Sequence, residues 1–187
     1  MSEWPFPGLE PGKYGAILAD PPWAFDAWGT QKNAAVNVTS YYDTMSIAHI
    51  SALPVKALAA RNSILFMWIC WPTMKHALDV IDAWGFTYKT CGFCWIKVSA
   101  NGEPRIGTGY WTRANSEVCL IATRGKPKRT AMDVHQAILE PRREHSRKPD
   151  CVYERIERLV AGPYCELFAR TRRPGWDSWG NQVGMFG

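Results

Sequence analysis

Short apolar runs alternate along the chain with segments whose apolar residues recur every three or four positions. The short runs are typical of buried strands, and the wider spacing is typical of helices with one buried face. These patterns predict strands over 14–19, 64–69, 86–96, 117–122 and 164–169, and helices over 46–58, 72–84 and from 149 onward. Strands that alternate with helices favour an α/β fold, in which a mostly parallel sheet carries helices on both faces.

The length and composition favour one domain. A chain of 187 residues suits a single domain, which we expect to span 1–187 with an extended, proline- and glycine-rich segment at 1–12. That segment lacks the basic start and apolar stretch of a signal peptide, and no apolar run is long enough to predict a membrane span. The expected location is therefore the cytoplasm.

The six cysteines predict neither disulfides nor a metal site. Most of them lie within apolar runs, where a thiol packs as a small core residue. Cys91 and Cys94 have the spacing of half a zinc site, but no second cysteine or histidine pair completes it. Positions three apart in a strand also point to opposite faces, so these two thiols are not expected to share a metal ion.

Three predicted loops, at 24–44, 98–113 and 124–147, are longer than most connections in a compact domain. Loops of that length usually serve a function or lack order. We expect functional contacts in them, and the long loops or a second subunit would then select the target.

A basic cluster occupies most of 124–148, on a chain whose net charge is +5. Two interpretations of this cluster stay open. It is either a solvated loop or a flap whose Arg142 and Arg143 displace counterions from the phosphates of a nucleic acid. Trp111 falls in a neighbouring predicted loop, where stacking on a base is a further candidate role.

The sequence Asp20-Pro21-Pro22-Trp23 directly follows the first predicted strand. Proline cannot donate to a strand ladder, so the chain leaves the sheet here and sets an acid at the carboxyl end of a strand. Open α/β sheets bind their ligands at that end. We expect the stiff turn to leave the carbonyls of Asp20 and Pro21 free to accept hydrogen bonds. In the alternative interpretation this is an ordinary turn in which Asp20 caps a helix.

A carboxylate, a free carbonyl and an aromatic ring suit chemistry on the exocyclic amine of a nucleobase. The amine nitrogen is a poor nucleophile because its lone pair is delocalised into the ring. Two acceptors can each take one N–H bond, which returns the lone pair to the nitrogen, while Trp23 supports the flipped base. We therefore expect Asp20, Pro21, Pro22 and Trp23 to form the catalytic centre, with an electrophile held in line.

Further motifs follow in order along the chain. They are Tyr42-Asp43-Thr44-Met45-Ser46, Leu65-Phe66-Met67-Trp68, Gly107-Thr108-Gly109-Tyr110-Trp111 with Glu117-Val118-Cys119-Leu120, His145-Ser146-Arg147-Lys148-Pro149, and Glu166-Leu167-Phe168-Ala169-Arg170 with Trp176 and Gly180-Asn181-Gln182. With the first motif they make the chain from about Ala16 to Val183 resemble the MT-A70 family of S-adenosylmethionine-dependent adenine N6-methyltransferases. The resemblance implies S-adenosylmethionine as the cofactor and a Rossmann-like methyltransferase sheet. It also implies a circular permutation, with the catalytic motif before the cofactor-binding motif.

The resemblance implies roles for individual residues as well. The cofactor is expected to bind to Asp20, Lys148, Glu166, Arg170, Asn181 and Gln182. Glu166 would accept hydrogen bonds from the ribose, and Lys148 would pair with the methionine carboxylate. Tyr42 is expected at the target base, although a packing role stays open. We expect the strands that carry Asp20 and Glu166 to lie side by side, with their carboxyl ends at one pocket. One departure is the stretch 169–173, which lacks the glycine-rich turn that many amino-methyltransferases have after the cofactor strand.

The expected activity is direct transfer of a methyl group from S-adenosylmethionine to N6 of adenine in DNA. RNA is the first alternative, because the base chemistry is the same once the base is flipped out. A non-catalytic nucleic-acid-binding subunit on the same fold is the second, and the intact Asp20 and Trp23 argue against it. Nucleic acid is the expected partner and no membrane is expected; a homodimer or a partner subunit stays open.

Overall fold

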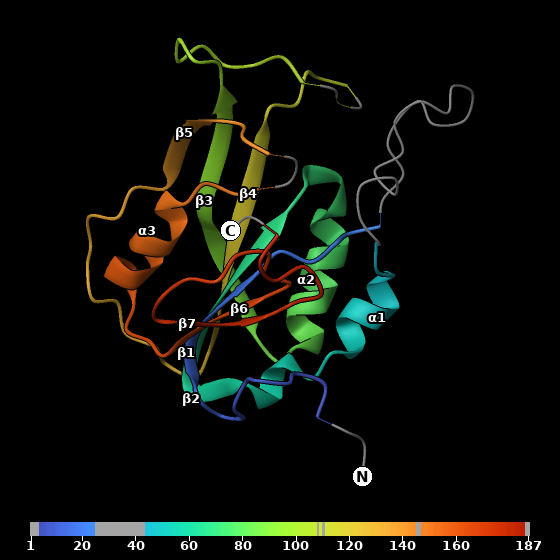
Figure 1. Ribbon diagram of the computed structural model, residues 1–187, viewed down its shortest axis with the longest axis vertical. Helices are drawn as coiled ribbons and strands as arrows, with labels where there is room; N and C mark the ends of the chain where they lie inside the picture. Colours follow the sequence, from blue (N-terminus) through green and yellow to red (C-terminus); the bar gives the residue numbers. More distant parts are fainter. Residues whose placement is uncertain (1–3, 25–43, 108, 110, 145–146, 186–187) are drawn as a thin grey trace.

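Figure 1 presents the computed structural model, which describes residues 4–24, 44–107, 109, 111–144 and 147–185. The helical elements in these ranges are α1 (Ile47–Ala52), η2 (Val55–Ala57), η3 (Trp71–Thr73), α2 (Met74–Ala83) and α3 (Cys151–Leu159). The strands are β1 (Tyr14–Ala19), β2 (Ala59–Ile69), β3 (Thr87–Val98), β4 (Ser116–Arg124), β5 (Ala137–Pro141), β6 (Tyr164–Leu167) and β7 (Trp176–Trp179). These strands form one sheet in the order β5-β3-β4-β2-β1-β6-β7.

The sheet is mixed, but one strand accounts for all its antiparallel pairing. β1 runs parallel to β2 and β6, β6 runs parallel to β7, and β3 runs parallel to β5. Among the described strands only β4 runs the other way, antiparallel to both β2 and β3. The prediction of a mostly parallel α/β sheet is thus confirmed. The carboxyl ends of the parallel strands meet at one edge of the sheet, and β4 begins at that same edge.

Helices cover both faces of the sheet, as Figure 1 shows with α1 and α2 on one side and α3 on the other. Alternate residues of a strand point to opposite faces, so each strand contributes to two apolar clusters. Ile17 packs in the cluster that includes α2 residue Ile81, whereas its neighbour Leu18 packs in the cluster that includes α3 residue Ile156. Residues on the α3 face at the carboxyl edge therefore face the segment that leads into α3.

The predicted helix over 46–58 is divided into two elements. Ser46 is the N-cap of α1, since its hydroxyl accepts a hydrogen bond from the His49 N–H at 3.2 Å. Pro54 separates α1 from the short η2, because a proline disfavours helical geometry at the residue before it and lacks an N–H. The expectation that Pro54 strains or ends the helix is confirmed.

The strand β5 lies inside the stretch 124–147, which the sequence pattern predicts to be a loop. That prediction is wrong over Ala137–Pro141, where the chain pairs in parallel with β3 as an edge strand. Only Ile138 of these five residues is buried, so the apolar pattern is too short to indicate a strand. β5 fixes where the following residue, Arg142, leaves the sheet.

None of the helices in the described ranges is long and apolar enough to cross a bilayer.

Candidate functional site

Asp20 stands where β1 ends at the carboxyl edge of the sheet. Its N–H is 3.5 Å from the Leu167 carbonyl of β6, which continues the pairing of these two strands by one residue. Beyond it, the Pro22 carbonyl accepts a hydrogen bond from the Met45 N–H at 2.9 Å. The side chain of Asp20 contacts Lys148 rather than a helix N-terminus, so the helix-capping interpretation does not hold.

Two expectations about the turn after β1 need correction. The Pro21 carbonyl is not free, because it accepts a hydrogen bond from the Trp23 N–H at 2.8 Å; its second lone pair is left for another donor. Trp23 is not on a loop surface but is 4% exposed, and its indole N–H donates to the Trp68 carbonyl at 3.0 Å. The ring folds back onto β2, where it holds the turn in place and does not offer a free face for a base.

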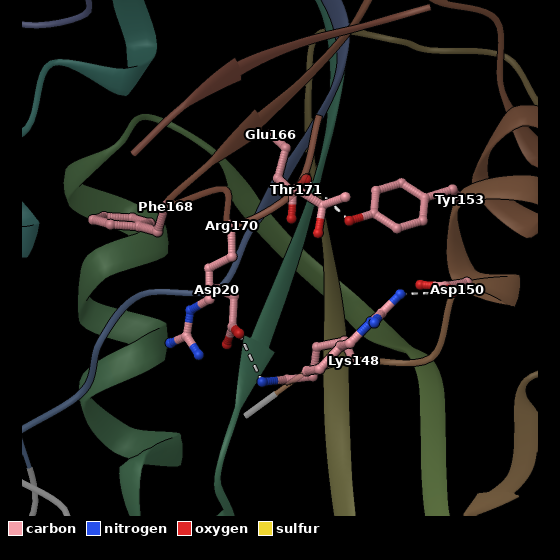
Figure 2. Close-up of a pocket in the computed structure, with 9 residues that line it drawn as sticks. Asp20, Lys148, Asp150, Tyr153, Glu166, Phe168, Arg170 and Thr171 are labelled. Atoms are coloured by element: carbon pink, nitrogen blue, oxygen red, sulfur yellow. Dashed lines mark hydrogen bonds and ion pairs between the residues drawn. The ribbon is translucent and has the colours of Figure 1, made fainter. Parts of the chain in front are cut away.

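A pocket lies beside Asp20, with about 370 Å³ of empty space that is partly open to solvent. It is lined by Asp20, Arg147, Lys148, Asp150, Tyr153, Glu166, Phe168, Arg170 and Thr171, most of which Figure 2 labels. We call it the Asp20 pocket. Because β1 and β6 are neighbours, Asp20 and Glu166 reach it from adjacent strands, and the segment before α3 supplies Lys148. The expectation that the ends of these two strands face one pocket is confirmed.

Lys148 connects two acidic side chains at this edge. Its Nζ lies 2.7 Å from Asp20 Oδ2 and 3.3 Å from Glu117 Oε2, and Glu117 Oε1 lies 2.5 Å from Lys97 Nζ. All four side chains are at least three-quarters buried, so solvent screens these contacts little. The four charges alternate in sign and sum to zero, which gives each buried ion a partner.

The network shifts the pKa values of Glu117 and Lys148. Burial alone raises the pKa of Glu117, but the ammonium groups of Lys148 and Lys97 outweigh it and lower that pKa to about 2. Burial likewise lowers the pKa of Lys148, and the carboxylates of Asp20 and Glu117 reverse this and raise it. Lys97 and Glu117 belong to this network, and neither is among the residues that the sequence predicts for a site. The available signal was Glu117, an acid at the start of a predicted apolar strand.

Glu166 lies in an environment that raises its pKa, in contrast to Glu117. The residue is 8% exposed, and its carboxyl accepts a hydrogen bond from the Tyr153 hydroxyl at 3.0 Å. Burial raises its pKa, with Asp20 adding to the effect, and the contributions of Tyr153, Lys148 and Arg170 oppose it; the result is a pKa of about 7. This pocket carboxyl therefore changes its charge near neutral pH.

We expect the substitution Glu166→Gln to stabilise the protein at high pH. The pKa of Glu166 is raised from 4.5 to about 7, so between these values the folded chain holds a proton that the unfolded chain has lost. Stability then falls as the pH rises through that window. A neutral glutamine removes this cost, so urea unfolding at about pH 8 should show a gain of up to about 3 kcal/mol that is absent below pH 4.5. The exposed Glu154→Gln is the control; an equal gain there, or no pH dependence, would contradict this account.

Phe168 makes the turn by which the chain leaves β6. Its φ of 62° lies in the left-handed region, which a non-glycine residue adopts at a cost. Its ring packs edge-on against Trp179 at 5.5 Å between centroids, and Trp179 packs in the same way against Phe6 at 5.0 Å. The chain thus takes a glycine-like turn after β6 without a glycine, and aromatic packing holds the strained residue at the Asp20 pocket.

Among the residues that the structure describes, the other predicted ones do not line the Asp20 pocket. Asn181 and Gln182 lie in the turn after β7, which the Gly184 N–H joins to the Arg170 carbonyl at 3.1 Å. Trp111 is 99% exposed in the connection from β3 to β4. Tyr42 lies outside the described residues. The roles of these residues stay predictions.

The two predicted phosphate contacts differ from each other. Arg143 pairs with Asp150 at 2.7 Å and donates to the Lys148 carbonyl at 3.2 Å, so it supports the segment that carries Lys148. Arg142 follows β5 and lines a second pocket. Their role in binding a nucleic acid stays a prediction.

Comparison with known proteins places these features in a family. The family model described as MT-A70 matches residues 14–182. The type II methyltransferase M.MunI of Mycoplasma sp is 32% identical over 195 residues, which cover 95% of this chain and 81% of that protein. A putative N(6)-adenosine-methyltransferase MT-A70-like protein of Medicago truncatula is 33% identical and the human N(6)-adenosine-methyltransferase catalytic subunit METTL3 is 29% identical. Each match covers 92% of this chain but only 27% and 28% of those proteins.

Proposed function

We propose that this chain, which belongs to the MT-A70 family of S-adenosylmethionine-dependent adenine N6-methyltransferases, methylates adenine in DNA. The observation that carries the proposal is the placement of Asp20 and Glu166 on adjacent strands at one pocket. A carboxylate for the target amine and a carboxyl for the cofactor then lie at the same edge. We further propose that the order of these motifs is a circular permutation of the methyltransferase sheet, within a single domain.

The residues of the Asp20 pocket fit S-adenosylmethionine. The cofactor has a ribose diol, a carboxylate and a positively charged sulfonium, which supplies an electrophilic methyl carbon. Glu166 offers a buried hydrogen-bonding group for the diol, and the ammonium of Lys148 suits the carboxylate. Arg170 supplies a further polar group in the pocket, and Asn181 and Gln182, in the turn joined to the Arg170 carbonyl, would supply others for the ribose and the adenine edge.

Asp20 orients the target amine in this proposal. Lys148 occupies Oδ2, so the other carboxylate oxygen accepts one N–H of the adenine amine, and the second lone pair of the Pro21 carbonyl accepts the other. Both acceptors pull the nitrogen toward tetrahedral geometry, which makes it a nucleophile in line with the methyl carbon. After transfer the nitrogen carries a positive charge, and its extra proton leaves to Asp20 or to water.

The match to a type II methyltransferase favours DNA over RNA. It is 32% identical over 95% of this chain and 81% of that protein. The chain is also similar to N(6)-adenosine methyltransferases, of which it spans about a quarter. RNA is the second candidate, because those relatives are named for adenosine and match the same 92% of this chain.

A labelled-methyl assay tests the substrate class. Purified protein is incubated with methyl-labelled S-adenosylmethionine and equal amounts of double-stranded DNA, single-stranded DNA or RNA, and the product nucleosides are separated. We expect label in N6-methyladenine from DNA, in single and double strands alike, because the flipped base meets the same acceptors in both. The Asp20→Ala protein gives the background. Label in RNA alone would replace DNA by RNA as the substrate, and label in none of the three above that background would refute the proposal.

A further inference from the structure

A second pocket opens at the same edge of the sheet, beyond β4 and β3. It holds about 690 Å³ of empty space, partly open to solvent, and is lined by Lys97, Arg105, Ile106, Gly107, Ala114, Asn115 and Arg142. We call it the Arg105 pocket. Lys97 comes from the end of β3, Arg142 follows β5, and the other residues belong to the connection that rises above β3 and β4 in Figure 1.

The wall of the Arg105 pocket is fixed by backbone contacts. The Arg105 N–H donates to the Lys97 carbonyl at 2.9 Å, and the Lys97 N–H donates to the Asn115 carbonyl at 2.9 Å. Gly107 packs so closely that a Cβ there would lie 1.9 Å from the Ala114 carbonyl oxygen, which only glycine allows. Arg142 directly follows Pro141, the residue of β5 that pairs with Val98. Two paired strands and a close backbone approach thus place the three cations around one space.

The charges of this pocket are unbalanced. Of the described residues that line it, three are cationic and none is a carboxylate. Lys97 is paired with Glu117, but Arg105 and Arg142 have no ion pair with any residue in the described ranges. Two other arginines differ: Arg143, next to Arg142 in sequence, pairs with Asp150, and Arg158, elsewhere on α3, pairs with Asp133. Two guanidinium groups without a counter-charge at one space are typical of a site for an anion.

The Arg105 pocket adjoins the catalytic acid through the charge network. Lys97 lies on its wall and contacts Glu117, which contacts Lys148, which contacts Asp20. A base whose amine reaches Asp20 belongs to a strand whose backbone must pass nearby. The anions of that backbone are phosphodiesters, and a guanidinium binds two phosphate oxygens at once.

We propose that the Arg105 pocket binds a backbone phosphate of the strand that presents the target adenine, with Arg105 and Arg142 as its main ligands. This inference rests on the proposed function and adds a site to it. The contact carries no sequence information, so it sets the register of the strand on the protein and leaves the choice of sequence to other residues.

The test replaces both cations by neutral residues. We expect the double variant Arg105→Gln/Arg142→Gln to bind a DNA duplex more weakly, and by the same factor for two unrelated sequences. Binding is measured by fluorescence anisotropy from about 50 to 200 mM salt. The log–log slope should be smaller in magnitude by about one for each phosphate that the variant no longer neutralises. Binding of S-adenosylmethionine should not change.

A matched control removes two positive charges elsewhere. Lys128 and Arg129 are exposed and follow β4, so they lie beyond its carboxyl end, at the opposite edge of the sheet. Lys128→Gln/Arg129→Gln should leave the slope unchanged. An unchanged slope in the Arg105 and Arg142 variant, or an equal loss in both variants, would overturn the phosphate site. Because the readout is binding, a lack of methyl transfer in the labelled-methyl assay would refute the proposed function without affecting this result.

Discussion

The substitution Asp20→Ala is expected to lower the rate of methyl transfer by about 10²- to 10⁴-fold, the range for removing a group that acts on the reacting atoms. The carboxylate is the acceptor that holds the target amine, and Glu166 and Arg170 remain to hold the cofactor. The binding constant for S-adenosylmethionine, measured by calorimetry, should therefore change far less than the rate measured with labelled methyl groups.

Two further variants separate the role of Asp20 from general disturbance. Asp20→Asn keeps the shape of the side chain but replaces one acceptor oxygen by a donor, so it should lose nearly as much rate as the alanine variant. Asp79→Ala removes an exposed acid on α2, far from the pocket lining, and should keep full activity. If Asp20→Asn retained most of the rate, the carboxylate would not be the acceptor that the mechanism requires.

Replacing Lys148 by methionine is expected to lower the free energy of unfolding by about 3–5 kcal/mol, the usual loss when one partner of a buried ion pair is removed. Asp20 and Glu117 both contact its ammonium group, so the variant deprives two buried carboxylates of the positive partner that they share, while Glu117 keeps its pair with Lys97. Urea unfolding measures the loss, and the exposed Lys126→Met should cost less than about 0.5 kcal/mol.

The pH dependence identifies the cause of that loss. The pKa of Glu117 is lowered from 4.5 to about 2, with Lys148 among the causes, so its contribution to stability is complete above pH 4.5 and disappears as the pH falls toward 2. The difference between wild type and Lys148→Met should therefore narrow over the same interval. A difference that stayed constant down to pH 2 would indicate a loss of packing instead of a loss of charge pairing.

The sequence could predict the Asp20 pocket because its main parts depend on strand ends. Apolar runs locate β1 and β6, and neighbouring parallel strands end at the same edge of a sheet. The sequence alone therefore predicts that Asp20 and Glu166 lie close together. The motif before α3 adds Lys148 on the ground of family resemblance. These residues are those that the structure brings together.

The missed features depend on contacts between segments that a linear pattern does not encode. Glu117 reaches Lys148 only because antiparallel pairing sets the start of β4 beside the end of β2. Trp23 follows two prolines, and nothing in its neighbours shows that the ring returns to the Trp68 carbonyl. The edge strand β5 is too short and too exposed for its pattern to differ from that of a loop.

The hydrogen bond from Met45 to the Pro22 carbonyl brings together two points of the chain that are far apart in sequence. Trp23 and Met45 also form a β-bridge, so these two points of the chain are held side by side next to the end of β1. A segment whose ends are already joined can change its length at little entropic cost. Insertions or replacements between Trp23 and Met45 should therefore be tolerated without moving Asp20. A different segment could be grafted between these two residues while the position of Asp20 stays the same.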